Sequence, residues 1–324
     1  MSKIISIVLP TYNGRNVLPY TLSVLKEQVL RNSECVELIV CNNASTDGTD
    51  EWLKEEIRDN SWLTYISYDI HVDGGESIER SAENASGKYI LFWGDDDVPG
   101  PMMVDILLEY TSKFPNVGCF HFSWLRGIDL GDGILRNLVV GKNSYEKEYI
   151  EYDSKEFIDK FYMSMNFMSA ELFLREAWIK GGEYDNTKSF GFQFLSRILH
   201  GISGYPGLFI SYPLCIQRSP IVKRWQSRSV YYCYIGIPNM LKELEKNGVI
   251  DNWRVLWNRL NSTSYFMHVV PQITLDKKFY KNYLGEIKNN LFSIWKKWMV
   301  DFLYYFVPKW VYSSLRNLVF KNGK

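Results

Sequence analysis

Three consecutive aspartates, Asp95-Asp96-Asp97, follow the apolar run Tyr89–Trp93 and a single glycine, Gly94. Carboxylates this close together repel one another and are costly to desolvate unless a positive charge lies among them. A divalent cation such as Mg²⁺ or Mn²⁺, which prefers hard oxygen ligands, would supply that charge. A solvated surface turn is the alternative interpretation, and other parts of the chain are needed to decide between the two.

Polar clusters follow three further segments that have the character of strands. They are Pro10-Thr11-Tyr12-Asn13-Gly14, Asn42-Asn43-Ala44-Ser45-Thr46-Asp47-Gly48 and Asp73-Gly74-Gly75. Each cluster alone is weak evidence, because Asn, Asp, Gly and Ser are also the ordinary residues of loops. In open α/β sheets, however, ligands bind outside the carboxyl ends of the strands. Four polar strand ends at one sheet edge therefore indicate a binding site, within which Asp47 is expected to be a cap or turn residue.

The elements that must position these clusters alternate along the first third of the chain. Apolar and β-branched runs predict buried strands over residues 4–10, 36–42, 63–69 and 89–93. Apolar residues at helical spacing predict helices over residues 18–29, from an N-cap at Thr49, and over residues 77–87. This alternation predicts a mainly parallel sheet of βαβ units. A helix at 101–111 and a strand at 117–123 are expected next, then loops and irregular strands over 125–153, and mainly helices from about Ser227.

Composition limits the classes of function. The chain has 324 residues, and its 37 basic and 37 acidic residues cancel, so no electrostatic footprint for nucleic acid is visible. Five scattered cysteines without a CxxC pair favour a reducing compartment over a disulfide framework or a zinc site. The N-terminal segment "MSKIISIVLPTYN" lacks the features of a signal peptide. These observations predict a cytoplasmic protein.

The last part of the chain, from Leu291 to Lys324, mixes large aromatic residues with lysine and arginine. Asp301, Pro308 and Lys309 interrupt its apolar residues before they reach the roughly 20 needed to cross a bilayer. Aromatic rings next to basic residues suit a segment that lies in a membrane interface. The alternative is a helix packed on its own domain, with its tryptophans and tyrosines in the core.

The segments "SIVLPTYNG", "VELIVCNNASTDGTDEWL" and "ASGKYILFWGDDDV" resemble, in order and spacing, the family 2 glycosyltransferases of GT-A fold. The later "SAELFLREAWIKGGEYD" is similar to the acceptor-side segment of that family. Within it, the chain resembles the abequosyltransferase-like and rhamnosyltransferase-like enzymes of bacterial surface polysaccharide assembly. The resemblance implies a GT-A domain, with a Rossmann-like, mostly parallel sheet flanked by helices, over residues 1–225. Residues 1–100 would bind the nucleotide sugar, residues 101–225 the acceptor, and residues 226–324 would form a helical C-terminal region.

The resemblance implies a nucleotide-sugar donor and assigns roles to the matching residues. The turn of Pro10, Thr11, Tyr12 and Asn13 would line the base and ribose, with Tyr12 offering a ring for stacking. Asn42, with Asn43 beside it, would contact the base edge, since an amide can pair with uracil, thymine or cytosine. Arg80 would approach the ribose or phosphates, unless it is only a solvated helix residue.

The aspartates would form the DXD-type motif of the family. In that interpretation Asp97 is the direct ligand of Mn²⁺ or Mg²⁺, and Asp95 contributes to the metal site and the ribose. Asp96 ranks next among the three aspartates as a contact of the donor or the metal ion. The cation would bridge the donor phosphates.

The acceptor half departs from the family pattern. An acidic pair that deprotonates the acceptor hydroxyl normally follows the Gly-Gly turn, but here Gln193 occupies this region and cannot act as a base. Candidate replacements are Glu171, Glu183 and Asp185, with His200 as an outsider. Glu171 could instead be an outward-facing strand residue, and Asp185 a turn or capping residue.

The sequence as a whole predicts a metal-dependent, inverting glycosyltransferase that acts at the inner face of the cytoplasmic membrane. The expected acceptor is a glycan on polyprenyl diphosphate, in O-antigen or capsule synthesis, with the C-terminal region in peripheral contact with the membrane. One alternative is a non-catalytic nucleotide- or glycan-binding protein of the same fold. A nucleotidyltransferase is a weaker alternative, because "LPTYNGRN" lacks a glycine-rich, basic phosphate loop.

Overall fold

The structure is a computed structural model that describes residues 2–58, 62–129, 135–140, 147–185, 191–219 and 229–311. These residues form two compact units. Unit 1 comprises the described residues of 1–185 and 194–221, and unit 2 those of 186–193 and 222–324. The domain boundary expected at residue 225 lies outside the described residues, as does Ser227.

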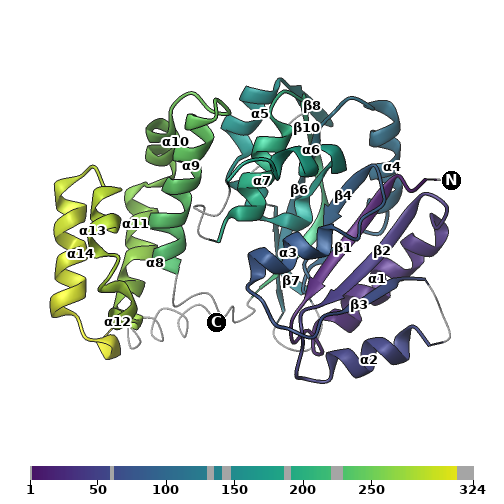
Figure 1. Ribbon diagram of the computed structural model, residues 1–324, viewed down its shortest axis with the longest axis horizontal. Coiled ribbons are helices and arrows are strands. Elements are labelled where there is room, and N and C mark those ends of the chain that lie inside the picture. Colours follow the sequence, from purple (N-terminus) through teal and green to yellow (C-terminus); the bar gives the residue numbers. More distant parts are fainter. Residues whose placement is uncertain are drawn as a thin grey trace. The chain divides into compact units, whose positions relative to one another are not determined.

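Unit 1 is built on one sheet whose strands follow the order β3-β2-β1-β4-β9-β6-β10-β5, with β7 beside β6 and β8 beside β10 (Figure 1). Strands β3, β2, β1 and β4 are parallel, and β9 runs antiparallel to both β4 and β6. The strands are β1 (Ile5–Thr11), β2 (Val36–Asn42), β3 (Thr64–Ser67), β4 (Tyr89–Phe92), β5 (Val98–Pro99), β6 (Cys119–Asp129), β7 (Leu135–Val140), β8 (Tyr149–Tyr152), β9 (Glu171–Leu174) and β10 (Gly207–Ser219).

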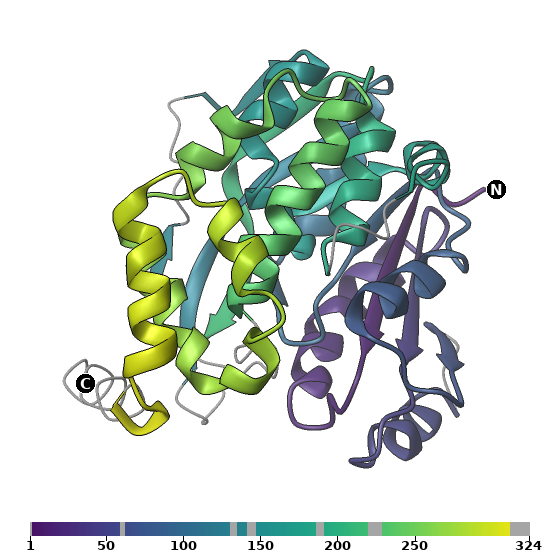
Figure 2. The ribbon, with the colours of Figure 1, turned by 60° about the vertical axis from the view of Figure 1, so that its left-hand side comes forward.

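Helices connect and cover these strands, and Figure 2 shows them packed along the sheet. The helices of this unit are α1 (Leu18–Arg31), α2 (Thr49–Glu56), α3 (Gly74–Ala82), α4 (Met103–Lys113), α5 (Ser154–Phe161), α6 (Arg175–Gly181) and α7 (Gln193–Ile202), with 3₁₀ turns at Ser164–Asn166 and Met168–Ala170. The predicted parallel sheet is confirmed for β3, β2, β1 and β4, and β2 has the predicted bounds. The rest of the sheet is mixed, because β10 is parallel to β6 while β5, β7, β8 and β9 pair antiparallel with their neighbours. The apolar residues of β1 and β4 are buried, as expected of strands covered on both faces.

Three predicted boundaries were wrong for local reasons. Gly48, at φ 88°, is the N-cap of α2, so Thr49 is the first helical residue rather than the cap. Helix α3 begins earlier than predicted, because Asp73 accepts a hydrogen bond from the amide of Glu76. It also ends earlier, at Ala82, where the Asn84 amide donates to carbonyls of the last turn.

The region 125–153, for which loops and irregular strands were predicted, contains part of a long strand. Strand β6 runs on to Asp129 because it pairs with β10 from Cys119↔Gly207 to Ile128↔Ser219. That pairing joins segments far apart in sequence, so local periodicity could not show it.

Unit 2 is helical, which confirms the predicted helical C-terminal region (Figure 1, green to yellow). Its elements are α8 (Ser229–Tyr231), a π-helical turn (Tyr232–Gly236), α9 (Ile237–Lys246), α10 (Trp253–Leu260), α11 (Thr263–Val269), a 3₁₀ segment (Val270–Leu275), α12 (Lys277–Tyr280), α13 (Leu284–Asn289) and α14 (Ile294–Phe306). Among the residues that the structure describes, none of the helices has the length and apolar character needed to traverse a bilayer.

Candidate active site

The polar strand ends meet at one edge of the sheet, as predicted. Thr11, at the end of β1, is in register with Asn42, at the end of β2, and Asn42 is in register with Ser67 on β3. The chain continues this pairing beyond the strands, because the amide of Asn43 donates to the carbonyl of Thr11 at 2.9 Å. The aspartate turn follows the adjacent strand β4, whose Phe92 pairs with Val8 of β1.

Hydroxyl groups from distant elements orient two of the three aspartates. Thr11 donates to Oδ2 of Asp95 at 2.6 Å. Ser169, in the 3₁₀ turn before β9, donates to Oδ2 of Asp97 at 2.6 Å and accepts from the amide of Gly94 at 2.9 Å. Thr21 of α1 donates to the backbone carbonyls of Asp95 and Asp97, each at 3.0 Å. Sequence reasoning missed Ser169 and Thr21, since no local motif marks them.

Two glycines make room for these carboxylates. A Cβ atom on Gly94 would lie 2.6 Å from Oδ2 of Asp97 and 3.2 Å from Oδ1 of Asp96. A Cβ atom on Gly14 would lie 2.3 Å from Oγ1 of Thr11 and 2.9 Å from Oδ2 of Asp95. Any side chain at either position would therefore displace the carboxylates or the hydroxyl that orients one of them.

The donor set of this turn fits a divalent cation. Asp95 and Asp96 are half-buried, whereas Asp97 is 5% exposed. Within the described residues there is no group of three or more His, Cys, Asp and Glu side chains arranged to enclose a metal ion. Mg²⁺ characteristically uses only one or two protein carboxylates and takes its other ligands from water and substrate phosphates. Carboxylates that are themselves held by hydroxyl donors, as Asp95 and Asp97 are, match that open kind of site.

The loop after β1 is braced against the loop after β2. Asn13, at φ 55°, donates its amide to Oγ of Ser45 at 2.8 Å, and its side-chain oxygen accepts from the amide of Thr46 at 2.8 Å. Asparagine tolerates this left-handed conformation better than most residues. Pro10 and Tyr12, on either side of buried Thr11, are half-buried and partly open to solvent. The brace therefore fixes the loop that was expected to line the donor nucleotide.

Asp47 is a turn residue, as expected. It accepts from the amide and the hydroxyl of Thr49 and from the amide of Arg15. Burial acts to raise the pKa of Asp47, but these hydrogen bonds outweigh it and hold the pKa below its usual range. The exposed Asp47 side chain thus stabilises the loop through hydrogen bonds to two backbone amides and to the Thr49 hydroxyl.

Tyr12 lies against a histidine that the sequence analysis did not select. The Tyr12 and His71 rings have centroids 4.0 Å apart and are tilted by 32°. His71 in turn has Nδ1 3.2 Å from the carbonyl of Asn43. One face of the Tyr12 ring is therefore paired within the protein, which restricts where a base could stack.

Asn43 and Arg80 form a polar junction below this ring pair. The Asn43 amide exchanges hydrogen bonds with the backbone of Val72, at 2.9 and 3.0 Å. Arg80 donates to Oδ1 of Asn43 and to the carbonyl of Ile70, and its guanidinium lies 3.8 Å from the centroid of the Tyr68 ring. Arg80 is therefore a constituent of the loop framework rather than a solvated helix residue.

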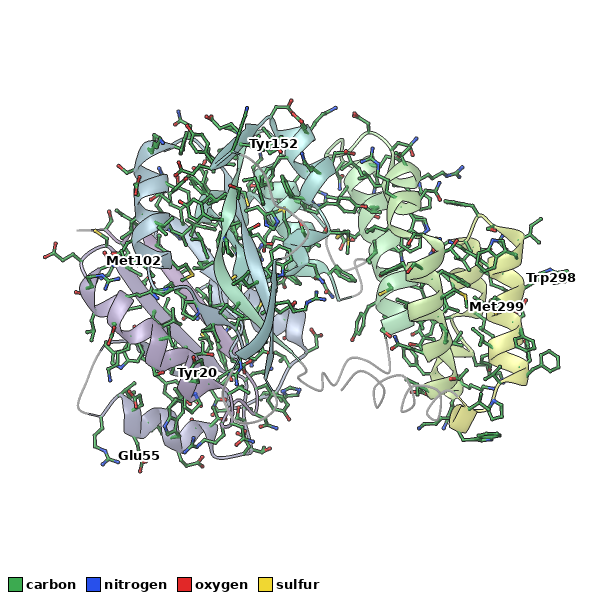
Figure 3. The ribbon with its side chains drawn as sticks, turned by 180° about the vertical axis from the view of Figure 1, so that it is seen from behind. Tyr20, Glu55, Met102, Tyr152, Trp298 and Met299 are labelled. Carbon is green, nitrogen blue, oxygen red and sulfur yellow. The ribbon has the colours of Figure 1, made fainter. Side chains whose placement is uncertain are left out.

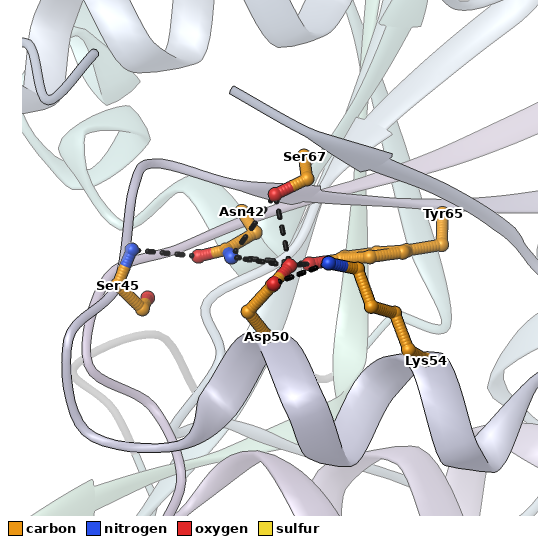
Figure 4. A network of polar contacts seen from close by, with 6 residues as sticks. All are labelled: Asn42, Ser45, Asp50, Lys54, Tyr65 and Ser67. Atoms are coloured by element: carbon orange, nitrogen blue, oxygen red, sulfur yellow. Dashed lines mark hydrogen bonds and ion pairs between the residues drawn. The ribbon is translucent and has the colours of Figure 1, made fainter. Parts of the chain in front are cut away.

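Asn42 takes part in a buried network that closes the loop after β2 (Figure 4). Its side-chain oxygen accepts from the amide of Ser45 at 3.1 Å, and its Nδ2 donates to the Tyr65 hydroxyl at 3.0 Å. Oδ1 of Asp50 lies 3.4 Å from the same Nδ2. Asn42 is 1% exposed. These contacts commit its amide to the protein, so they argue against the predicted contact with the base edge.

Asp50 is the charged centre of that network. Lys54, one turn along α2, contributes most to lowering the pKa of Asp50 to about 2, followed by the Tyr65 hydroxyl, which donates to Oδ1. Burial, together with that hydrogen bond, raises the pKa of Tyr65 to about 12. The network thus holds a carboxylate that stays ionised throughout the physiological range and anchors β3 to α2.

Glu171 is buried in the middle of the sheet. It is 1% exposed and faces His121, its partner in the β6–β9 pairing, with 3.5 Å between Oε1 and Nδ1. Neither carboxylate oxygen makes a hydrogen bond. Burial raises the pKa of Glu171 and lowers the pKa of His121 to about 3, so burial favours the neutral form of each group.

A base must reach the hydroxyl that it deprotonates. The burial of Glu171 argues against that role and also excludes the alternative of an outward-facing strand residue. Glu183 and Asp185, the other acidic candidates, are exposed, and Asp185 directly precedes residues outside the described range. His200, the outsider, is fully buried. Gln193 is the first residue of α7, and its side-chain oxygen is buried without a hydrogen bond.

Comparison with known proteins places this geometry in a family. Residues 6–177, just over half of the chain, match the model of glycosyl transferase family 2. Abequosyltransferase RfbV of Salmonella typhimurium is 26% identical over 163 residues, which cover 45% of this chain and 46% of that protein. Glycosyltransferase GlyA of Streptococcus pneumoniae is 27% identical over 182 residues, covering 54% of this chain and 24% of that protein. The chain thus spans about half, or less, of the length of these curated relatives.

The crystal structure of S. aureus TarS 1-349 has the same fold. Its TM-score is 0.64 at 14% identity, over 89% of this chain and 80% of that chain. The same protein in complex with UDP aligns over 97% of this chain and 91% of that chain, with a TM-score of 0.64 at 12% identity. Together with the family match, this likeness shows that the chain belongs to the family 2 glycosyltransferases and has the GT-A fold.

Proposed function

We propose that the chain transfers a sugar from a nucleotide-sugar donor to a glycan acceptor, with Mn²⁺ or Mg²⁺ held at the aspartate turn. The observation that carries the proposal is the orientation of two carboxylates, Asp95 and Asp97, by the hydroxyls of Thr11 and Ser169 at the carboxyl end of a parallel sheet. A solvated turn would need neither a buried serine nor glycines that leave room for carboxylates.

In this mechanism Asp97 and Asp95 hold the cation and Asp96 contributes to its surroundings. When bound, the cation supplies positive charge that offsets the charge of the leaving nucleoside diphosphate. Ser169 and Thr11 keep the two carboxylates in one orientation, so less ordering is needed when the donor binds. Family membership supports the nucleotide-sugar donor.

The loop after β1 is proposed to receive the nucleotide. Pro10 and Tyr12 offer apolar surface next to Asn13, and the Ser45 and Thr46 contacts hold that loop in place. Four residues that were expected to touch the donor instead support the loop after β1 through the contacts described above: Thr11, Asn42, Asn43 and Arg80. Selectivity for the nucleobase of the donor is therefore proposed to depend on the shape of the loop after β1 rather than on the Asn42 amide.

Asp185 is proposed as the base that deprotonates the acceptor hydroxyl, with inversion at the anomeric carbon. Glu171 is buried, whereas Asp185 and the neighbouring Glu183 are exposed, and an exposed carboxylate can reach an acceptor from solution. A glycan on polyprenyl diphosphate is the proposed acceptor, in O-antigen or capsule synthesis at the inner face of the cytoplasmic membrane. The relative named as an abequosyltransferase supports this choice of pathway class.

Hydrolysis of nucleotide sugars tests the proposal without knowledge of the acceptor. The wild type should release nucleoside diphosphate from one donor class only when Mn²⁺ or Mg²⁺ is present. Asp97→Asn should lower this rate by about a hundredfold or more, because charge stabilisation is lost. Asp251→Asn, at an exposed aspartate of unit 2, is the matched control and should retain the rate. Nucleotide binding without turnover of any donor would favour the alternative, a non-catalytic binding protein of this fold.

A further inference from the structure

Helix α14 presents a continuous apolar face to solvent. Positions 294, 298, 302 and 305 recur at intervals of four and three residues, and 295 and 306 lie beside them, so the set occupies an arc of about 120°. The side chains of this face are between 44% and 75% exposed: Ile294, Trp295, Trp298, Phe302, Tyr305 and Phe306. Exposed apolar patches of this kind mark interaction sites.

The opposite side of α14 holds the helix in unit 2. Val300 is fully buried, and Lys296, 7% exposed, donates through Nζ to the carbonyl and side-chain oxygens of Asn261. Trp298, by contrast, points away from the neighbouring helices of its unit (Figure 3). The prediction of a helix that buries its tryptophans in its own core therefore does not describe α14. Trp295 packs edge-on against Phe266, whereas Trp298, Phe302 and Phe306 are more than half exposed.

The charges around this face are mainly positive. Among the described residues 294–311, Lys297 is half-exposed and Lys309 is exposed, and the single acidic residue is Asp301. Asp301 is paired with Lys288 at 2.9 Å, which offsets its charge. Lys297 flanks the apolar face, and exposed Lys309 precedes Trp310, which is 69% exposed. The surroundings of the apolar face thus complement a negatively charged partner.

We propose that the α14 face docks on the surface of a bilayer that contains anionic phospholipid. Tryptophan and tyrosine rings favour the headgroup level, where one end of the ring is apolar and the other is hydrated. Basic residues beside them gain attraction from anionic lipid. A second copy of the same face would bring two basic segments together, which disfavours a symmetric dimer as the occupant. The inference rests on α14 alone and stands whether or not the chain transfers a sugar.

Vesicle flotation of the full chain tests the docking surface directly. The wild type should float with vesicles of phosphatidylcholine containing one third phosphatidylglycerol. The triple variant Trp298→Ser, Phe302→Ser, Phe306→Ser should bind at least about tenfold more weakly, because it removes the apolar contact. Val255→Ser with Met267→Ser, at exposed apolar positions elsewhere in unit 2, is the matched control and should bind like the wild type. Since all these side chains are exposed, the melting temperatures should stay alike.

The charge of the lipid provides a second arm. Lys297→Gln with Lys309→Gln should weaken binding to the anionic vesicles by roughly tenfold and change binding to pure phosphatidylcholine little. Equal flotation of the wild type and the triple variant would overturn the proposal. The proposal would also be overturned if the wild type bound neither kind of vesicle but formed an oligomer that the triple variant does not form. The α14 face would then bind protein.

Discussion

Ser169 donates a hydrogen bond of 2.6 Å to Oδ2 of Asp97 across 72 residues of sequence, while its own oxygen accepts from the amide of Gly94. The serine is fully buried. It therefore fixes both the carboxylate and the backbone of the turn that carries it. This relationship couples the 3₁₀ turn before β9 to the proposed metal site.

Ser169→Ala should weaken Mn²⁺ binding in the presence of nucleoside diphosphate by about 10- to 100-fold, as is typical when the partner of a metal ligand is removed. Isothermal titration of Mn²⁺ into the nucleotide complex measures this. Ser81→Ala removes a fully buried serine of α3 that donates to the carbonyl of Ser77 and contacts the thiol of Cys41, and serves as the control. Equal Mn²⁺ affinity in Ser169→Ala and the control would show that the serine is merely a packing residue.

Asp185→Asn should lower the turnover number of sugar transfer by about a hundredfold or more, the typical contribution of a general base. Glu171→Gln should retain a turnover number close to that of the wild type, because its carboxyl group is buried away from solvent. Steady-state kinetics at saturating donor measure both. A large loss in Glu171→Gln with an intact melting temperature would restore the buried glutamate as the base, and full activity of Asp185→Asn would exclude Asp185.

Glu171 should also give the stability of the protein a characteristic pH dependence. Its raised pKa means that the folded protein keeps a proton that the unfolded chain releases above about pH 4, so stability falls as pH rises toward the folded pKa. His121 has the opposite sign: with a pKa of about 3, it lowers stability as pH falls below about 6.5 and adds no slope above that pH.

Glu171→Gln cannot titrate and should lose the decline above pH 6.5, which approaches about 1.4 kcal/mol per pH unit for one proton. Urea denaturation of both proteins at pH 6.5 and pH 8 measures the difference in the free energy of unfolding. Burial and the nearby Glu171 raise the pKa of the Cys119 thiol, and pH 8 stays below the ordinary cysteine pKa of about 8.5, which limits the contribution of this thiol. Parallel pH profiles would show that Glu171 is ionised in the folded protein.

The network around Asp50 should depend more on Tyr65 than on Lys54. Lys54 lowers the pKa of Asp50 most, but its side chain is 61% exposed and solvent screens the pair, so Lys54→Gln should cost less than about 1 kcal/mol. Tyr65→Phe removes a hydrogen bond to a charged group and should cost about 1.5–3 kcal/mol. Urea denaturation at pH 7 compares them. A larger loss for Lys54→Gln would mean that the ion pair dominates.

Much of the N-terminal part of unit 1 could be predicted, because the sequence patterns that specify it are local. Strand runs, helix periodicity and the polar ends of β1, β2 and β4 are contiguous in sequence, and the parallel sheet brings them together without further information. The remaining contacts depend on strand pairing between segments that are far apart in sequence. Ser169 reaches Asp97, and His121 reaches Glu171, only because β9 enters the sheet between β4 and β6. No local pattern shows that the buried Glu171 faces His121. Nor does any local pattern show that the Asn42 amide donates to the Tyr65 hydroxyl.

The most direct test of the metal site is the melting temperature of the chain with a panel of nucleoside diphosphates, each with and without Mn²⁺. A ligand that binds only the folded state raises its stability by mass action. We expect one nucleoside diphosphate to raise the melting temperature only when Mn²⁺ is present, and Asp97→Asn to abolish that shift. A panel in which no nucleotide shifts the wild type, with or without metal, would contradict the account and leave the aspartates as a solvated turn.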